Sequence, residues 1–433
     1  MSQFTTISEI IEEVSEQEID IVKFHFSDIG GTFKEIDVPA ALLENAFSKG
    51  LPFDNSVGGT FKPTGADLML KPDPRTFSIL EGGRNQKIGR VTCELTFLDG
   101  QSFDGCVRST LKLFVRKIYQ SGYTFSVSSS FSFYLLDSHF TGQPRDFSCS
   151  PETLLKAENT KRDILTALKN ADIDVVSLRQ THADGPISIA FKEGSVLRTA
   201  DNIMTAKYII SDVSRRHNLC ATFMPKPLTN AEGLATTFGF VLMKDEFNEF
   251  YHPDQDMMIS DKARGFIAGI FKHIRAICAV TNPTVNSYKR IVQKGKAPYY
   301  VSWSAVDRNS LIRLPSSRGR ATKIEVQNAD SSCNPYLSLL VLLSAGISGI
   351  DDNLTPIAAV NFETHDYSES EKQSLSAGTL PTTLRDALAA LNSDTLIQDA
   401  LGESVFTTLI QTATIEWNDY IGCVHNWELE RYL

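Results

Sequence analysis

The sequence predicts an α+β protein with a small N-terminal sheet domain and a larger mixed domain. Three observations predict it. The chain has 433 residues, which is too long for one small core. Its first hundred residues show strand-like alternation around turn signals, whereas helix signals are frequent from residue 103 onward. The later strands interleave with these helices without strict βαβ order, which favours antiparallel pairing.

The N-terminal domain is expected over residues 1–102 and begins with one amphipathic helix. IDIVKFHFSD and TFKEIDVP then alternate apolar and polar residues, and the Ile-Gly-Gly between them supplies a turn. RVTCELTFLDG adds a strand that ends in Asp-Gly. These segments predict a small domain built on a sheet.

The second domain, residues 103–433, combines helices with further strands. TLKLFVRKIYQSG ends at Gly122, and SPETLLKAENTKRDILTALKNA opens with a Ser-Pro cap. TADNIMTAKYIISDVSRRH has apolar residues at helical spacing. Strands are expected at 123–136, 186–191, 235–243, 299–303 and 322–327.

Composition excludes several classes of partner. The net charge is −10 and no Lys/Arg run occurs, so we expect no nucleic acid. No apolar window reaches the roughly 20 residues that span a bilayer, and the acidic N-terminal segment does not resemble a signal peptide. Seven scattered cysteines without a C-x-x-C pair indicate reduced thiols in a cytoplasmic protein. P-loop and G-x-G-x-x-G motifs are absent from the sequence.

Several blocks of sequence identify a family. They are FKEIDVP, FDNSVGG, ADLMLKPDPRTF, TADNIMTAKYII, ATFMPKP, NPTVNSYKR, APYYVSWSAVDRNSLIRLPSSRGRATKIEV, NPYLSLLVLLSAG and VHNWELERYL. In this order and spacing they resemble glutamine synthetase of the short bacterial type over almost the whole chain. The resemblance implies a β-grasp-like N-terminal domain and a larger domain whose curved antiparallel sheet forms a half-barrel, surrounded by helices.

The resemblance also implies an assembly and a chemistry. In the family, active sites lie between neighbouring subunits of a six-membered ring, and two rings stack. Divalent cations there hold ATP while the γ-carboxylate of glutamate is phosphorylated, and ammonia then displaces phosphate. We therefore expect a ring-shaped homo-oligomer. Stacking into a dodecamer stays open, because the chain stops at Leu433, a few residues earlier than the family's closing segment.

The family's paired metal-binding glutamates are replaced in the stretch SVSSSFSFYL. Strand alternation puts Ser130, Ser132 and Tyr134 on one face, and Phe131 and Phe133 on the other. Alignment to the family's G-P-E-P-E-F-F-L strand places Ser130 and Ser132 at the two glutamates. A neutral hydroxyl is a poor substitute for a carboxylate as ligand to a hard dication.

The other metal positions implied by the resemblance are also neutral, with one exception. Thr181 and Ser188 stand where two further glutamates belong, and Ala235 stands at a histidine. Only Glu325, in TKIEV, keeps the family's ligand. His182 lies nearby in sequence, but no H-E-x-x-H spacing occurs among the histidines.

The substrate positions implied by the resemblance are mixed. Arg290, Arg308 and Arg313 match arginines that hold the glutamate carboxylate, phosphate and nucleotide in the family, and planar guanidinium groups suit such oxyanions. An inherited structural role for these arginines is the competing interpretation. Gln327 replaces a second glutamate-binding arginine.

The ammonium site is altered as well. Asp54 matches the neighbouring-subunit aspartate that helps to bind ammonium, and is expected to be vestigial. Lys296 replaces the acidic flap residue, which reverses the sign of the charge there.

The sequence therefore predicts a glutamine-synthetase-like protein without glutamine synthetase activity, a pseudoenzyme that serves as a binding, regulatory or assembly scaffold. No bound cofactor is expected. Its partners would be copies of itself, an active glutamine synthetase or another protein. The alternative is an ATP-dependent glutamate–amine ligase or transferase with a changed substrate, which would use ATP with Mg²⁺ or Mn²⁺. A purely structural, filament-forming protein is a third option.

Overall fold

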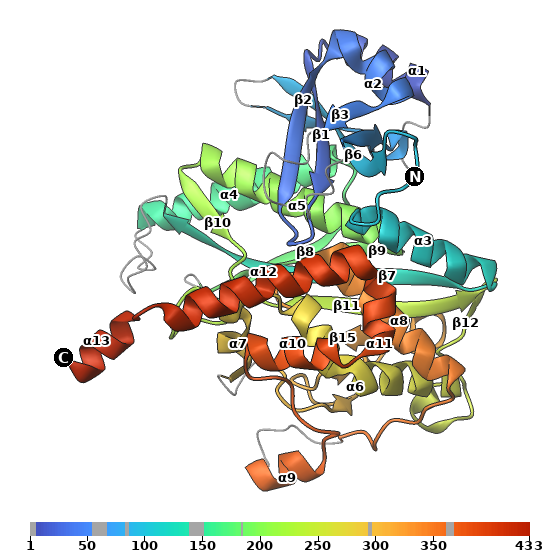
Figure 1. The fold of residues 1–433 in the computed structure, drawn as a ribbon, viewed down its shortest axis with the longest axis vertical. Coiled ribbons are helices and arrows are strands. Elements are labelled where there is room, and N and C mark those ends of the chain that lie inside the picture. The colour runs from blue at the N-terminus through green and yellow to red at the C-terminus, as the bar shows by residue number, and fades with distance from the viewer. Residues whose placement is uncertain are drawn as a thin grey trace.

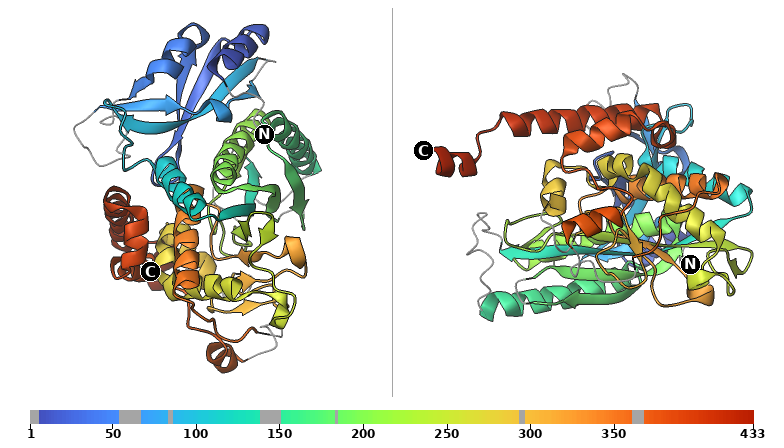
Figure 2. Two further views of the ribbon diagram at one scale, coloured as in Figure 1. Left: turned by 90° about the vertical axis from the view of Figure 1, so that its right-hand side faces the viewer. Right: turned by 90° about the horizontal axis from the view of Figure 1, so that it is seen from below.

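A computed structural model describes residues 6–53, 67–82, 86–137, 151–182, 185–292, 297–360 and 368–433. It has two lobes, the N-terminal sheet domain and the larger domain (Figures 1 and 2). None of the helices in these ranges combines the length and apolarity that a bilayer span requires.

The N-terminal lobe is a β-grasp domain. Its described strands form a six-stranded sheet in the order β2-β1-β6-β4-β3, with β5 beside β6, and β1 runs parallel to β6. The elements are α1 (Ile7–Glu16), β1 (Ile21–Ser27), β2 (Phe33–Pro39), α2 (Leu43–Lys49), β3 (Leu51–Phe53), β4 (Leu68–Pro72), η2 (Pro74–Thr76), β5 (Ser78–Glu81) and β6 (Lys87–Phe97). The predicted first helix is present, fixed by a capping box between Thr6 and Glu9. The short α2 was not predicted.

The large lobe is built on a curled half-barrel sheet. Nine strands of the described chain form it, in the order β13-β14-β15-β11-β7-β9-β8, with β10 beside β7 and β12 beside β11. Pairing is antiparallel except between β13 and β14. The strands are β7 (Thr124–Asp137), β8 (Val175–Gln180), β9 (Ile187–Ser195), β10 (Leu219–Thr222), β11 (Thr236–Lys244), β12 (Phe247–Asn248), β13 (Trp303–Ser304), β14 (Ile312–Arg313) and β15 (Ile324–Val326).

The predicted strands are confirmed in four places and wrong in one. β7, β9, β11 and β15 fall within or close to the expected ranges. The expected strand at 299–303 is reduced to Trp303 at its end, because Val301 and Tyr299 pair instead with the chain around Gly378 and Leu380. The backbone there is satisfied by an irregular segment and needs no long strand.

Helices make up the rest of the large lobe, and several of them, α5 among them, pack on the half-barrel. They are α3 (Val107–Gln120), α4 (Pro151–Asn170), α5 (Val196–Arg216), α6 (Asp261–Thr281), α7 (Val285–Val292), α8 (Pro335–Asp351), α9 (Glu369–Ser374), α10 (Leu384–Asn392), α11 (Thr395–Leu401), α12 (Glu403–Gly422) and α13 (Asn426–Tyr432). Aromatic side chains of β7 and β11 pack on them: Phe125 and Phe240 both contact Phe266 of α6. The opposite face of β7 is thereby left for polar side chains.

Helices α6 and α8 touch backbone to backbone. A Cβ added to Gly269 would lie 2.1 Å from the carbonyl oxygen of Ala345, and one added to Gly349 would lie 2.1 Å from that of Gly265. No side chain fits at either point, so glycine is required. At the chain end, α12 crosses the large lobe and α13 projects beyond it, with Trp427 and Tyr432 exposed (Figure 1).

Candidate functional site

Strand β7 separates an aromatic face from a serine face. Phe131 and Phe133 are buried in the core, as predicted, and Ser130 is half-buried on the other side. The register pairs Ser130 with Ala190 of β9 and with Thr237 of β11. Residues directly opposite in an antiparallel pair share a face. We call the face of the half-barrel sheet that carries Ser130, Ala190 and Thr237 the mouth.

The Ser132 side chain is hydrogen-bonded to the backbone of Ala235. Its Oγ accepts from the amide of Ala235 at 2.9 Å and donates to the carbonyl of Ala235 at 3.2 Å. Ser331 donates to the same carbonyl at 3.2 Å. The Ser132 side chain is buried and fastens β7 to the start of β11, so it does not offer a ligand to the mouth.

Thr237 is the mouth residue of β11 that sequence reasoning missed. Ala235, which was expected at the histidine position, lies just before β11 begins, whereas Thr237 stands opposite Ser130. The two-residue period of TTFGFVLMK, with Phe238 and Phe240 in the core, could have indicated this. Either register leaves a neutral side chain at the position.

The remaining neutral positions lie toward the edge of the sheet. Ser188 is exposed on β9 and pairs with Ser132. Thr181 and His182 are exposed in the turn after β8, where the carbonyl of His182 accepts from the amide of Gly185 at 3.0 Å. These side chains add hydroxyl groups and one imidazole to the sheet edge.

A row of residues crosses the mouth on four neighbouring strands. Ser128 pairs with Gly239, Gly239 with Glu325, and Glu325 with Arg313. Gly239 keeps the row compact, because an added Cβ would lie 2.5 Å from the Ser128 Oγ and 3.4 Å from the Glu325 Cγ. The row therefore brings Glu325, the residue predicted to be a retained metal ligand, beside Arg313, which is predicted to be a retained substrate arginine.

Glu325 is bound by two cations. The Arg313 Nη1 lies 3.3 Å from its Oε2, and the Lys323 Nζ lies 2.9 Å from its Oε1. All three side chains are partly shielded, with exposed fractions of 16% for Glu325, 34% for Arg313 and 29% for Lys323. The cluster contains one carboxylate and two cationic side chains, so its net charge is +1. This charge repels a dication.

Within the described ranges no group of three or more His, Cys, Asp or Glu side chains comes together in a way that could hold a metal ion. Asp54 and Lys296, the two residues expected at the ammonium site, lie outside the described residues. The residues that are described do not fit a Mg²⁺ or Mn²⁺ cluster, because hard dications need several oxygen ligands and compensating negative charge.

Arg290 has a structural role in this fold. It is buried on α7, and its Nη2 donates to the carbonyl of Asn328 at 2.5 Å and to that of Ala329 at 3.4 Å. Its stem packs on Gly233, where an added Cβ would lie 2.5 Å from the Arg290 Cγ. Burial lowers the pKa of Arg290. The guanidinium supports the 328–329 backbone.

Gln327 and Arg308 belong to one connection. The Gln327 Nε2 donates to the carbonyls of Arg308 and Ser310, at 3.2 Å each, and thereby holds this loop against β15. Arg308 itself is exposed. The Gln327 amide therefore braces this loop.

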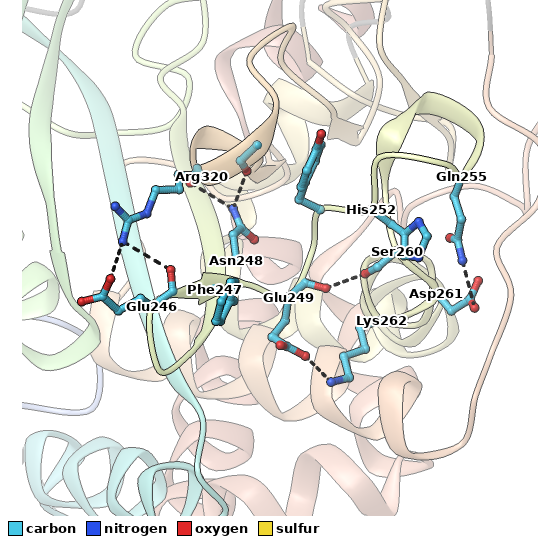
Figure 3. A pocket seen from close by; sticks show the side chains of 12 residues that line it. Glu246, Phe247, Asn248, Glu249, His252, Gln255, Ser260, Asp261, Lys262 and Arg320 are labelled. Atoms are coloured by element: carbon cyan, nitrogen blue, oxygen red, sulfur yellow. Dashed lines mark hydrogen bonds and ion pairs between the residues drawn. The ribbon is translucent and has the colours of Figure 1, made fainter.

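A cavity of about 820 Å³ lies apart from the mouth, beside β12 and the start of α6 (Figure 3). Two of its acidic side chains are paired with cations, Glu246 with Arg320 at 3.4 Å and Glu249 with Lys262, and Asp261 accepts from the Gln255 amide. None of the predicted site residues lines it. Its size therefore does not by itself indicate chemistry.

The fold and the mouth define a class: a β-grasp domain joined to a half-barrel sheet whose mouth carries hydroxyl side chains and the Arg313–Glu325–Lys323 cluster. Family models agree with this class. The β-grasp domain of glutamine synthetase matches residues 18–107, and the catalytic domain of glutamine synthetase matches residues 104–432. The chain belongs to the glutamine synthetase family.

Relatives match over the full length. Glutamine synthetase of Methanosarcina mazei is 35% identical over 100% of this chain and 99% of its own, and that of Thermotoga maritima is 35% identical over 99% of each. Among solved structures, a GmaS/ADP complex superposes with a TM-score of 0.87 at 24% identity, covering 99% of both chains. Plasmodium falciparum glutamine synthetase gives a TM-score of 0.87 at 21% identity, again over 99% of both.

Proposed function

We propose that this protein uses the glutamine synthetase fold as a binding, regulatory or assembly scaffold and does not make glutamine. The observation that carries the proposal is the Arg313–Glu325–Lys323 cluster beside the neutral pair Ser130 and Thr237. The one acid that matches a family metal ligand already has two cationic partners.

The physical argument concerns phosphoryl transfer. Charge develops on the transferred phosphoryl group, and metal ions are the usual means of neutralising it. Serine and threonine hydroxyls supply no negative charge, and a cluster with a net positive charge opposes the entry of a dication. Without the ions, ATP and glutamate would not be brought together for reaction. The mouth suits an anion better than a metal.

A second candidate is an ATP-dependent glutamate–amine ligase or transferase with a changed substrate. The comparisons favour this candidate over an inactive protein, because the relatives reported above bear the name glutamine synthetase and a close structural neighbour is a GmaS/ADP complex. The retained Glu325, Arg308 and Arg313 also support it. It requires metal ligands beyond those in the described residues.

Turnover of the purified protein separates the two. We expect no phosphate release from ATP with Mg²⁺ or Mn²⁺, glutamate, and either ammonium or methylamine, and no γ-glutamyl transfer. An active glutamine synthetase in the same assay is the control. Sustained amine-dependent turnover would establish the second candidate and refute the scaffold proposal.

Nucleotide binding gives a second test. A ligand at 100 times its dissociation constant adds about 2.7 kcal/mol to stability, which a thermal melt detects. The scaffold proposal predicts no metal-dependent rise in melting temperature with ATP. A rise that needs both ATP and Mn²⁺ would contradict it.

For assembly, we propose a ring of identical subunits in the cytoplasm, with an active glutamine synthetase subunit or a regulatory protein as further partners. The family membership and the β-grasp domain support this proposal. Mass photometry of the purified protein is the test, with six-fold or twelve-fold particles expected and monomers contrary to it.

A further inference from the structure

A further cavity opens beside α6, on the side of the large lobe away from the N-terminal domain (Figure 1). Its volume is about 560 Å³, and small-molecule sites usually measure roughly 300–1,000 Å³. One wall is α6, and the other walls are the segments 354–357, after α8, and 377–379, after α9. The residues that line it differ from those of the mouth and from those of the cavity in Figure 3.

The walls of this cavity are fixed and largely apolar. The Val301 amide donates to the Gly378 carbonyl at 2.9 Å, and the Trp303 indole nitrogen donates to the Ile357 carbonyl at 2.8 Å, so both loop segments are bonded to the chain around residue 302. Such a surface can bury hydrocarbon without first having to rearrange. The apolar side chains of the lining include Ala268, Phe271, Ile274, Val301, Leu354 and Ile357.

The charged side chains that line the cavity are both positive. They are Lys272 and Arg275, one turn apart on α6. Lys272 pairs with Asp352 at 3.4 Å, whereas no carboxylate of the described chain lies within ion-pair distance of Arg275. Two positive charges and one negative charge leave a net charge of +1 beside an apolar surface.

Arg275 has hydrogen-bond donors that the protein does not use. Its Nη1 donates to the Thr379 carbonyl at 2.8 Å, which holds the guanidinium against the 377–379 wall. Its Nε and Nη2 have no acceptor among the described residues. The hydroxyls of Thr355 and Thr379, which also line the cavity, make no hydrogen bond within the same part of the chain. A guanidinium with free donors suits a carboxylate.

We propose that this cavity binds a monocarboxylate with an apolar body, of the class of a medium-chain aliphatic acid. The carboxylate pairs with Arg275, and the hydrocarbon body lies on the apolar lining. An inorganic anion would leave that lining in contact with water, and an uncharged apolar molecule would make no use of Arg275. A molecule with both parts uses both features of the site. Binding here is independent of any activity at the mouth.

Calorimetric titration of the full chain with hexanoate tests the proposal. We expect one saturable site per chain and no binding of acetate in the same concentration range. The affinity should rise about threefold for each methylene group added between butanoate and hexanoate, because each adds apolar surface that is buried. Hexanamide keeps the apolar body and lacks the charge, so it should bind at least about tenfold more weakly than hexanoate.

Three variants place the ligand in this cavity. Arg275→Gln should weaken hexanoate binding at least about tenfold, the equivalent of one charged hydrogen bond. Asp352→Asn should strengthen it about twofold, because Lys272 loses its competing partner. Ala377→Trp puts a large side chain at the wall of the cavity and should abolish binding. Arg275 and Ala377 are exposed, so we expect these variants to fold.

Two arginine variants are matched controls. Arg215→Gln removes an exposed arginine that pairs with Asp212 on α5, and Arg313→Gln changes the mouth; both should leave the affinity for hexanoate unchanged. Absence of saturable hexanoate binding overturns the proposal. So does hexanamide binding as tight as that of hexanoate, or hexanoate binding that survives both Arg275→Gln and Ala377→Trp.

Discussion

The domain junction and the mouth of the half-barrel differ in how many carboxylates they contain and in how these are neutralised. At the junction, Arg108 and its carboxylate partners form a buried, tightly bonded network. At the mouth, Ser130 and Thr237 contribute hydroxyl groups, and the Glu325 carboxylate is paired with both Arg313 and Lys323. Buried acids are kept where the protein itself provides the counter-charge. Clustered acids whose counter-charge would have to be a metal ion are absent from the described mouth.

The largest expected effect tests the junction. Arg108→Met removes the cation that Asp73, Glu94 and Asp201 share, and breaking a buried ion pair from one side costs about 3–5 kcal/mol. We expect a loss of this size in the free energy of unfolding, measured by urea denaturation. Arg215→Gln, an exposed arginine with one acidic neighbour, should change stability by less than about 0.5 kcal/mol. Equal losses of stability in Arg108→Met and Arg215→Gln would show that the buried network is no more important for stability than an exposed ion pair.

A buried base without a full counter-charge gives the next test. His25 is fully buried between Phe33 and Tyr208; its Nε2 is 3.5 Å from Glu35, too far for a good hydrogen bond, and Lys23 and Arg90 oppose its charging. Burial lowers the pKa of His25 to about 4, from 6.5. Between these values the unfolded chain binds a proton that the native chain does not. Stability is therefore full above pH 6.5 and is lost as the pH falls toward 4.

The shift corresponds to a loss of up to about 3 kcal/mol from this residue. We expect His25→Met to flatten the decline in unfolding free energy between pH 7 and 4.5. His182→Gln, an exposed histidine, is the control. A parallel decline in wild type and His25→Met would show that His25 is not responsible.

At the mouth, the comparison predicts that an added acid alone will not restore a metal site. Ser130→Glu should bind Mn²⁺ at least about tenfold more weakly than Ser130→Glu combined with Arg313→Gln and Lys323→Gln, because the two bases repel the ion. Ser130→Gln in the same double background lacks the carboxylate and is the control. Calorimetric titration with Mn²⁺ measures the difference. Tight binding to Ser130→Glu alone would mean that the bases do not exclude the metal.

The smallest expected effect is the difference in stability between the Ser132→Ala and Ser130→Ala variants. Ser132→Ala removes the acceptor of the Ala235 amide and should cost about 1 kcal/mol, whereas Ser130→Ala should stay within about 0.5 kcal/mol. Thermal denaturation of the two variants measures it. If Ser130→Ala cost the more, Ser130 would have a structural role that its contacts do not reveal.

Much of the fold could be predicted from local patterns. The alternation in SVSSSFSFYL fixed the two faces of β7, and helical spacing with caps located α3 and α5. The short β8 and β10 were missed, because strands of a few residues at the edge of a sheet carry little periodic signal. The expected strand at 299–303 was wrong because its partners come from a segment about eighty residues later in the chain.

The sequence shows which side chains the candidate site contains, but not all of their pairings. The neutral residues at Ser130 and Ser188 could be read from the sequence. The pairing of Glu325 with Lys323 was also readable, since residues two apart on a strand share a face. The approach of Arg313 to Glu325 depends on the β14–β15 register, and the Arg108–Asp201 bond joins residues on two helices. Such long-range pairings depend on tertiary packing and leave no local pattern.

The contact between α6 and α8 has a mechanical consequence. At Gly265, Gly269 and Gly349 the two backbones are in direct contact, so main-chain atoms fix the spacing between the helices there. A methyl group added at any of these glycines would push the helices apart.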